Sequence, residues 1–185
     1  MQTELVVRAR RGDREAFSVL AGGAVDRLYA IARLILRDAE LAEDATQEAL
    51  VKAWQGLPTL RDVERFDAWT YRLIVRACAD IGRHRRRWRT EITVLPTEPA
   101  ESDRVSELAD RDQLERALRR VSDAQRTILV LTFYVGLSAT DVADALDIPV
   151  GTAKSRLHYA IEALRAAIEA DDRSASRVLQ EGRPA

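Results

Sequence analysis

The sequence has little of what most enzyme and secreted-protein chemistries need. It contains one cysteine, Cys78, and two histidines that lie far apart in the chain. A single cysteine excludes an internal disulfide and a cysteine-based zinc site, and two distant histidines form no metal-binding motif. The chain also lacks a glycine-rich phosphate loop and a carboxylate cluster suited to metal ions. We therefore expect a protein that is not an enzyme and has no catalytic residue, cofactor or metal.

Long apolar runs are also missing. No segment could span a membrane, and the N-terminal segment MQTELVVRARRGD lacks the apolar core of a signal peptide. We expect a cytoplasmic protein without membrane insertion. The 185 residues are 46% hydrophobic, which suits one medium domain or two small ones. The net charge is only −1, but charges of each sign are segregated along the chain.

The most informative segment is LSATDVADALDIPVGTAKSRLHYAIEALRAAI, residues 137–168. Ser138 and Asp141 predict a capped helix start, and Asp147-Ile148-Pro149 predicts a break followed by a second helix. In that second helix the apolar residues from Val150 onward share one face. The opposite face and one flank carry polar and cationic side chains. This is the pattern of a helix-turn-helix whose second helix enters the major groove, and an ordinary helical hairpin is the alternative.

An acidic helix is expected at residues 38–55. Its alanines and Leu50 form a buried side, and the other face carries Asp44, Gln47, Glu48 and Val51 at helical spacing. The simpler interpretation is a solvated acidic face. The alternative is a docking surface for a basic partner helix, with Val51 as its apolar contact.

A basic helix is expected at residues 66–89. Arg76, Arg83 and Arg87 lie within about 60° of Arg72 on the helical wheel, and Trp69 lies on the same strip. Guanidinium groups beside an aromatic ring suit a phosphate backbone with a stacked base, as in single-strand binding. The alternative is a solvated helix end whose cations complement the helix dipole.

The remaining segments set the expected domain boundaries. Gly22-Gly23 is expected to break or kink the helical run that follows Asp13. The segment that begins at Thr90 is acidic, contains two prolines and reads as a flexible linker. Ser122 with Gln125 forms a capping box ahead of another helix. We expect an all-α fold of two small domains, residues 1–89 and 108–170, with a linker at 90–107 and a disordered tail at 171–185.

Three segments in this order, AELAEDATQEALVKAW, RFDAWTYRLIVRACADIGRHRRR and the helix-turn-helix, resemble a known family. The chain is identified as similar to bacterial RNA polymerase sigma factors of the sigma-70 family, of the extracytoplasmic-function (ECF, group IV) type. The resemblance covers residues 10–89 and 108–168. It implies a region 2 helical bundle and a region 4 helix-turn-helix, in a factor that directs core RNA polymerase to promoters.

The resemblance also implies a role for each candidate surface. The acidic helix would bind the clamp helices of the polymerase's largest subunit through Asp44, Gln47, Glu48 and Val51, and region 4 would contact the flap region. The loop at 56–65 and the basic helix would capture the −10 element through Arg61, Trp69, Arg72, Arg76, Arg83 and Arg87. The second helix of the helix-turn-helix would read the −35 element through Thr152, Lys154, Ser155, Arg156, His158 and Tyr159.

Two further expectations come with the resemblance. An anti-sigma factor is the usual regulator of this type, and it could hold the protein at the membrane. The rival function is a stand-alone helix-turn-helix regulator that binds duplex DNA unaided. Such a regulator would leave the basic strip and the acidic docking face unexplained.

Overall fold

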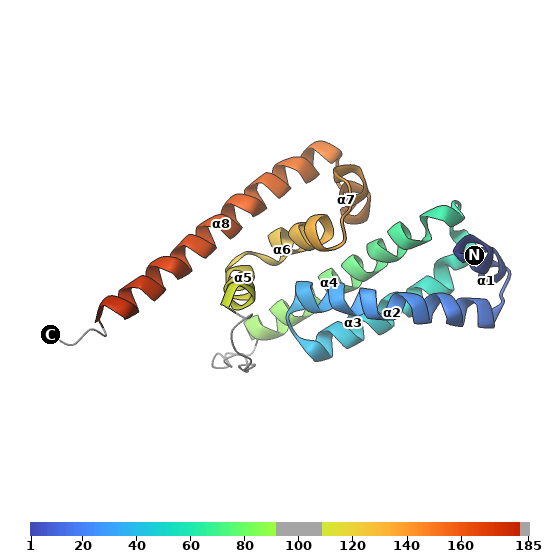
Figure 1. The fold of residues 1–185 in the computed structure, drawn as a ribbon. Coiled ribbons are helices and arrows are strands. Elements are labelled where there is room, and N and C mark those ends of the chain that lie inside the picture. Colours follow the sequence, from blue (N-terminus) through green and yellow to red (C-terminus); the bar gives the residue numbers. More distant parts are fainter. Residues whose placement is uncertain (92–108, 182–185) are drawn as a thin grey trace.

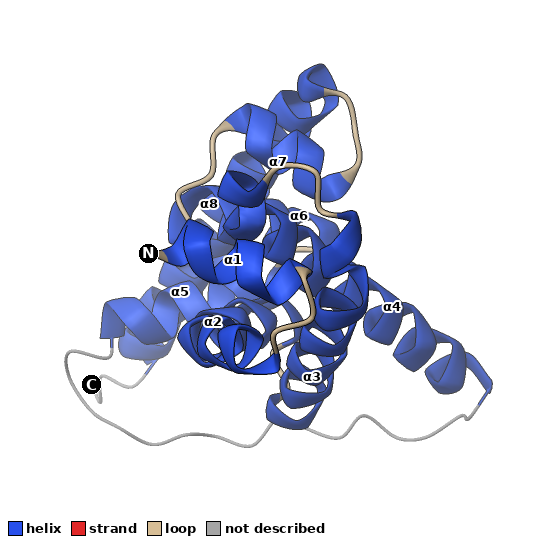
Figure 2. Cartoon of the chain, turned by 90° about the vertical axis from the view of Figure 1, so that its right-hand side faces the viewer, coloured by secondary structure: helices blue, strands red, loops and turns tan. Residues whose placement is uncertain are grey.

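The computed structural model describes residues 1–91 and 109–181, and every regular element in these ranges is helical (Figures 1 and 2). None of the described helices is long and apolar enough to cross a membrane. The α-helices are α1 (Gln2–Arg10), α2 (Arg14–Leu36), α3 (Ala39–Gly56), α4 (Phe66–Glu91), α5 (Ala109–Arg120), α6 (Asp123–Leu129), α7 (Ala139–Leu146) and α8 (Val150–Glu181). Short 3-10 turns η1 (Leu57–Thr59) and η2 (Val63–Arg65) precede α4, and a π-helical turn η3 (Val130–Tyr134) follows α6.

The first half of the chain is a bundle of α2, α3 and α4, with α1 packed across one end (Figure 1). Asp13 and Asp38 cap α2 and α3, each accepting a hydrogen bond from a backbone N–H three residues on. Small alanines of α3 let the three helices approach closely. A second apolar cluster, which includes Val6, Leu20 and Phe66, fixes α1 and the loop before α4 to the end of the bundle.

Helix α2 is continuous, so the expected break at Gly22-Gly23 was wrong. Both glycines are exposed, neither has a positive φ, and a Cβ on either would meet no atom within 4 Å. The buried residues on both sides of the pair, Leu20 and Ala24 to Ile35, hold the helix against the core. Packing over 23 residues therefore outweighs the roughly 1 kcal/mol that each glycine costs inside a helix.

The second half comprises α5 to α8, with α8 running along the other three (Figure 1). The predicted capping box is confirmed: Ser122 Oγ accepts from Gln125 N, and Gln125 Oε1 accepts from Ser122 N at 2.9 Å. The helix that it opens ends in the π-helical turn η3 rather than in regular α-helix.

Helix α8 continues to Glu181, so the expectation of a disordered tail from residue 171 was wrong for residues 171–181. Asp171 is buried and pairs with two arginines of α5, Arg120 at 2.5 Å and Arg116 at 3.4 Å. This buried carboxylate fixes the helix to α5 beyond the point where the apolar pattern ends. The expected linker at 90–107 lies almost wholly in 92–108, outside the described residues, and α4 runs through its first two residues.

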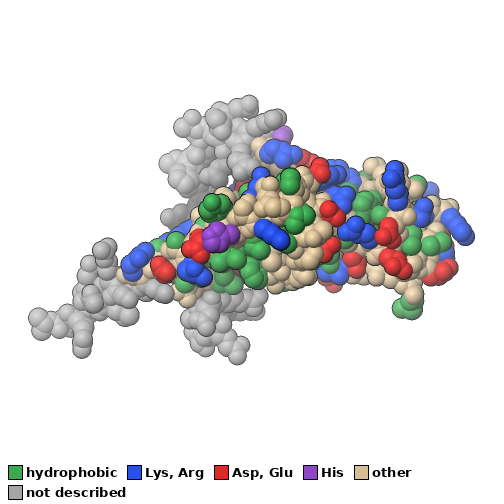
Figure 3. Space-filling model, turned by 90° about the horizontal axis from the view of Figure 1, so that it is seen from above, with side chains coloured by type: hydrophobic (Ala, Val, Ile, Leu, Met, Phe, Trp, Pro, Cys, Tyr) green, Lys and Arg blue, Asp and Glu red, His purple; other side chains and the backbone are tan. Residues whose placement is uncertain are grey.

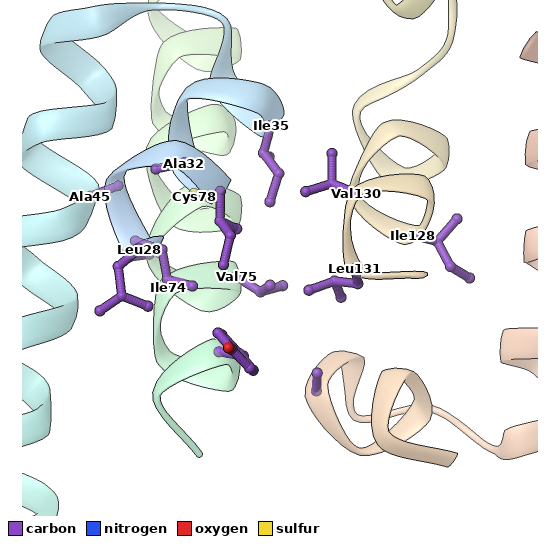
Figure 4. Close-up of a cluster of buried hydrophobic side chains, with 14 of the residues drawn as sticks. Leu28, Ala32, Ile35, Ala45, Ile74, Val75, Cys78, Ile128, Val130 and Leu131 are labelled. Carbon is purple, nitrogen blue, oxygen red and sulfur yellow. The ribbon is translucent and has the colours of Figure 1, made fainter. Parts of the chain in front are cut away.

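The two halves share one hydrophobic core. Ile35 of α2 and Val75 of α4 point toward Val130 and Leu131 of η3 (Figure 4). Arg126 of α6 lies beside this contact, and its Nε donates to the carbonyl oxygen of Ile35 at 2.8 Å. One carbonyl at the end of α2, that of Ile35, thus accepts a hydrogen bond from the other half of the chain. Helix α7 in turn packs against α4.

Candidate nucleic-acid and protein interfaces

The helix-turn-helix has the geometry that the sequence predicts. Ser138 caps α7 by accepting from Asp141 N. Asp147 ends α7 in the left-handed region, with φ 55°, and the Ile148 N–H donates back to the Ala143 carbonyl at 3.0 Å. Asparagine and aspartate are the non-glycine residues that most readily adopt this conformation. Pro149 then accepts from Ala153 N at 3.0 Å, so α8 begins at Val150.

Helix α8 brings together the residues predicted to read the −35 element. Its buried side contributes Ala153 and Ala160 to the core. The predicted residues turn outward: Thr152 is partly buried, and the exposed ones are Lys154, Ser155, Arg156, His158 and Tyr159. Tyr159 is 67% exposed and its ring centroid lies 5.6 Å from that of His158. An aromatic pair beside three hydrogen-bonding side chains can contact both base edges and phosphates.

The predicted −10 strip is only partly an open surface. Arg61 and Arg83 are exposed, and Arg83 pairs with Asp80 on its own helix. Arg72 and Arg76 instead face the turn between α7 and α8, where Arg76 lies 3.7 Å from Asp147. The side chain of Arg87 lies outside the described residues.

Trp69 is only partly exposed. Its ring packs 6.1 Å from that of Phe66 and so closely on Gly56 that an added Cβ there would lie 3.1 Å from it. The ring therefore belongs to the apolar cluster at the end of the bundle. The helical wheel of α4 placed Trp69 beside the arginines. A wheel of one helix could not show that the end of α3 packs on the Trp69 ring.

The predicted docking face on α3 divides into two parts. Gln47 and Val51 line an apolar groove of about 600 Å³ between α2 and α3, together with Phe17, Val25, Asp26, Tyr29, Glu43, Thr46, Leu50 and Trp54. Val51 is 48% exposed. Asp44 is also exposed. The groove is a feature that the wheel did not predict, because α2 supplies one of its walls.

The fourth predicted docking residue, Glu48, faces the other way. It forms an ion pair with Lys52 at 2.6 Å, and Lys52 also approaches Asp80 of α4 at 3.8 Å. The hydrogen bond to Glu48 raises the pKa of Lys52. The ammonium group of Lys52 therefore partly neutralises the charge of Glu48 toward a partner that approaches the groove.

Acidic residues of α7 form ion pairs with the first half of the chain that the sequence analysis did not predict. Arg65 lies 3.1 Å from Asp144 and 3.5 Å from Asp141, in addition to the pair between Arg76 and Asp147. The only sequence signal was three aspartates at three-residue spacing, which place one negative side on α7 and its turn. Nothing in that spacing identifies the arginines that they meet.

The described residues contain no group of histidine, cysteine and acidic side chains that could hold a metal ion. Cys78 is buried in the core, and burial raises the pKa of its thiol to about 12. A thiol in this state is neutral at physiological pH and is not a nucleophile. On the face of the molecule that Figure 3 shows, acidic and basic side chains lie close together, which accords with the small net charge.

Comparison with known proteins places this geometry in a family. Residues 24–90 match the family model of sigma-70 region 2, and residues 117–166 match that of sigma-70 region 4. The RNA polymerase sigma-H factor of Pseudomonas aeruginosa is 31% identical over 90% of this chain and 93% of its own length. The chain belongs to the sigma-70 family of sigma factors. It is 34% identical over 83% of its length to the ECF sigma factor SigM of Mycobacterium tuberculosis, of which 77% is covered.

Two solved structures have the same fold. The structure of CnrH in complex with the cytosolic domain of CnrY matches 92% of this chain and 98% of its own, with a TM-score of 0.66 and 26% identity. The sigma factor RpoE of Bartonella quintana, solved with the anti-sigma factor NepR, matches 84% of this chain and 98% of its own, with a TM-score of 0.67 and 24% identity.

This ECF sigma factor is thus a transcription initiation factor that directs RNA polymerase to promoters. Members of the family are not enzymes. Because the chain carries region 2 as well as region 4, a stand-alone helix-turn-helix regulator is not the favoured interpretation.

Proposed function

We propose a specific division of labour among the surfaces of this sigma factor. The groove between α2 and α3 would bind a helical element of core RNA polymerase, the clamp helices of its largest subunit, with Gln47, Val51 and the nearby Asp44 as contacts. The exposed face of α8 would read the −35 element. The arginines of α4 would hold the −10 strand. The domain boundaries at residues 89 and 108 belong to the same proposal, as does a location in the cytoplasm.

The groove is the observation that carries the polymerase-binding part. An apolar channel with a half-exposed valine and acidic and amide side chains suits an amphipathic helix that also carries basic residues. Burial of apolar surface supplies affinity, and the acidic side chains orient the partner. The solvated-face interpretation of α3 accounts for the charges but leaves the groove unexplained.

Run-off transcription tests the function as a whole. Purified protein and core RNA polymerase are added to fragmented DNA from the source genome, with core polymerase alone as control. We expect discrete transcripts only when both proteins are present. Footprints by the protein alone, without any transcript, would instead support a stand-alone regulator.

A matched pair of valine substitutions tests the groove. Val51 lines it, whereas Val19 of α2 is 59% exposed and does not. Val51→Glu places a charge where apolar surface must be buried, so we expect at least a roughly tenfold loss of affinity for core polymerase. Val19→Glu should leave this affinity unchanged. Equal affinities for the two variants would refute the assignment.

Arg156→Ala tests the −35 surface. If Arg156 contacts a base edge, we expect a loss of roughly 1–3 kcal/mol that depends on the −35 sequence. The measurement is transcription from promoters found in the run-off assay, with each −35 base pair varied in turn. An equal loss on every sequence would show that Arg156 contacts only phosphate.

An anti-sigma factor is the regulatory partner that we propose. The solved complex of RpoE with NepR supports this, since the described chain shares its fold. Purification of the tagged chain from its source organism, followed by mass spectrometry, would identify such a protein. Recovery of core polymerase subunits alone would argue against it.

A further inference from the structure

Helix α1 lies against the loop that is expected to capture the −10 element. It packs at the end of the bundle on α2 and on the turns η1 and η2 (Figure 1). These turns belong to residues 57–65, here called the −10 loop, which carries the exposed candidate Arg61. The match to region 2 begins at residue 24, so α1 lies outside it.

The −10 loop consists of buried apolar residues with exposed side chains between them. Leu57, Leu60 and the following Phe66 are at most 8% exposed. They share one apolar cluster with Val6 and Ala9, the two buried residues of α1. The exposed side chains between them are those of Pro58, Thr59, Arg61, Asp62, Glu64 and Arg65. Apolar contacts to which α1 contributes therefore set the positions of the exposed side chains.

Hydrogen bonds inside the −10 loop are local. The Leu60 N–H donates to the Leu57 carbonyl at 3.1 Å, and the Glu64 N–H donates to the Asp62 carboxylate at 3.0 Å. Bonds that span two or three residues stabilise a single turn, but they do not fix one turn relative to the next. Packing on α1 therefore contributes to the shape of the loop as a whole.

A single carboxylate oxygen joins α1 and α2 to the start of α4. Asp67 Oδ1 accepts from Gln2 Nε2 of α1 at 2.9 Å and from Arg27 Nη2 of α2 at 3.0 Å. The Arg27 guanidinium also lies over the ring of Tyr71, 5.0 Å from its centroid, and Tyr71 is buried in the core. Asp67 thus lies where three helices meet, two residues after the −10 loop.

Helix α1 depends on these contacts in turn. It has nine residues, and a helix of this length is marginally stable in water by itself. Its two buried residues and the bond from Gln2 to Asp67 hold it in place. A weakened contact should therefore loosen α1 and the −10 loop together.

We propose that α1 is a brace for the −10 loop and that Asp67 is a positioning residue for capture of the −10 strand. The brace holds the exposed side chains of the loop in place before DNA arrives. A loop that is ordered before binding loses less conformational entropy on binding, so its affinity is higher. The proposal rests on the proposed capture of the −10 strand by this region, and it adds a helix outside the region 2 match.

Hydrogen exchange of the full chain bound to core polymerase tests the brace. Val6→Ala removes two methyl groups from a fully buried side chain, and Asp67→Ala removes the acceptor of both bonds. We expect residues 57–66 to exchange roughly three- to tenfold faster in both variants, while α8 is unchanged. Thr3→Ala, at an exposed position of α1, is the control and should match the wild type. Wild-type exchange in both variants would overturn the proposal.

A double substitution shows whether Asp67 acts through α1. Gln2→Ala removes only the bond from α1 and should speed exchange of the loop less than Asp67→Ala does. Gln2→Ala combined with Asp67→Ala should exchange like Asp67→Ala alone, because the two changes remove the same bond. Fully additive effects would show that Asp67 does not act through Gln2, and the positioning role would be wrong.

Binding of a single-stranded −10 oligonucleotide to the holoenzyme tests the consequence. The oligonucleotide is the non-template strand of a promoter found in the run-off assay, and in a second set each −10 base in turn is replaced by an abasic site. We expect Val6→Ala and Asp67→Ala to bind the intact strand roughly three- to tenfold more weakly than the wild type. The difference should shrink at the abasic positions that weaken wild-type binding most, and affinity for core polymerase should stay within about twofold.

The outcomes separate the brace from the function on which it rests. If abasic sites weaken wild-type binding but both variants bind the intact strand normally, the brace is refuted and the −10 function stands. If the variants lose the same factor on every oligonucleotide and on core polymerase, the effect is general instability and the positioning role is wrong. If neither abasic sites nor Arg61→Ala alters binding, the −10 function of the loop is refuted, and the brace with it. Asp67 is 38% exposed, so Asp67→Ala decides these outcomes even if Val6→Ala does not fold.

Discussion

Arg126 offers a sharp test of how the two halves are held together. Its side chain is 6% exposed, and it joins three elements through one guanidinium group. Nε donates to the Ile35 carbonyl at 2.8 Å, Nη1 to that of Leu118 at 3.0 Å and to that of Val121 at 3.4 Å, and Nη2 to the Asp123 carboxylate at 2.6 Å. Burial lowers its pKa, although the ion pair with Asp123 opposes this shift.

Arg126→Met removes every one of these donors but keeps a long apolar stem. Three backbone carbonyls, those of Ile35, Leu118 and Val121, would lose this partner, and each buried unsatisfied acceptor costs roughly 1–3 kcal/mol. Since some of these carbonyls can recruit water, we expect a total loss of roughly 3–5 kcal/mol in the free energy of unfolding. Because one of the bonds crosses between the halves, we also expect unfolding to separate into two transitions.

Urea unfolding followed by circular dichroism measures both effects. Arg119→Met is the control: Arg119 lies near the end of α5, the helix before that of Arg126, and is exposed, so its loss should change the stability by less than about 0.5 kcal/mol. Arg126→Lys should fall in between, because an ammonium group cannot direct donors along the planar fork. A cost below about 1 kcal/mol for Arg126→Met would refute the reasoning.

Two further predictions concern the first half of the chain. Gly22→Ala with Gly23→Ala should raise the free energy of unfolding by about 1–2 kcal/mol, since both sites are exposed, helical and open; thermal unfolding measures this, and no gain would mean that the glycines relieve a strain. Cys78, whose pKa is raised to about 12 by burial, should resist alkylation by iodoacetamide in the folded protein at neutral pH and react only in urea; mass spectrometry measures this, and rapid labelling of the folded chain would contradict its burial.

Most helix starts could be predicted from the sequence because their signals are local. Asp13, Ser122 and Ser138 each cap a helix by accepting a hydrogen bond from the backbone N–H three residues later. The break at Asp147-Ile148-Pro149 is equally local, as is the division of α8 into a buried and an exposed face. The helix-turn-helix and the exposed −35 candidates were therefore predictable in detail.

The errors of the sequence analysis share one cause. Gly22-Gly23 reads as a break, and the residues after 170 read as a tail, when only neighbours along the chain are considered. Buried residues on both sides of the glycines keep α2 straight, and Asp171 fixes α8 to two arginines more than 50 positions away. In both cases tertiary contacts stabilise a helix that the helix propensity of the local sequence would not predict.

The sequence by itself thus determined the helices, their polar and apolar faces and the family. The tertiary structure decided which of those faces remain available. The wheel placed Trp69, Arg72 and Arg76 on one strip, but the folded chain packs Trp69 on Gly56 and sets Arg72 and Arg76 against α7. The physical reason is distance along the chain: Arg76 and Asp147 meet across 71 positions, and a contact of that kind depends on how whole helices pack, which no short segment encodes.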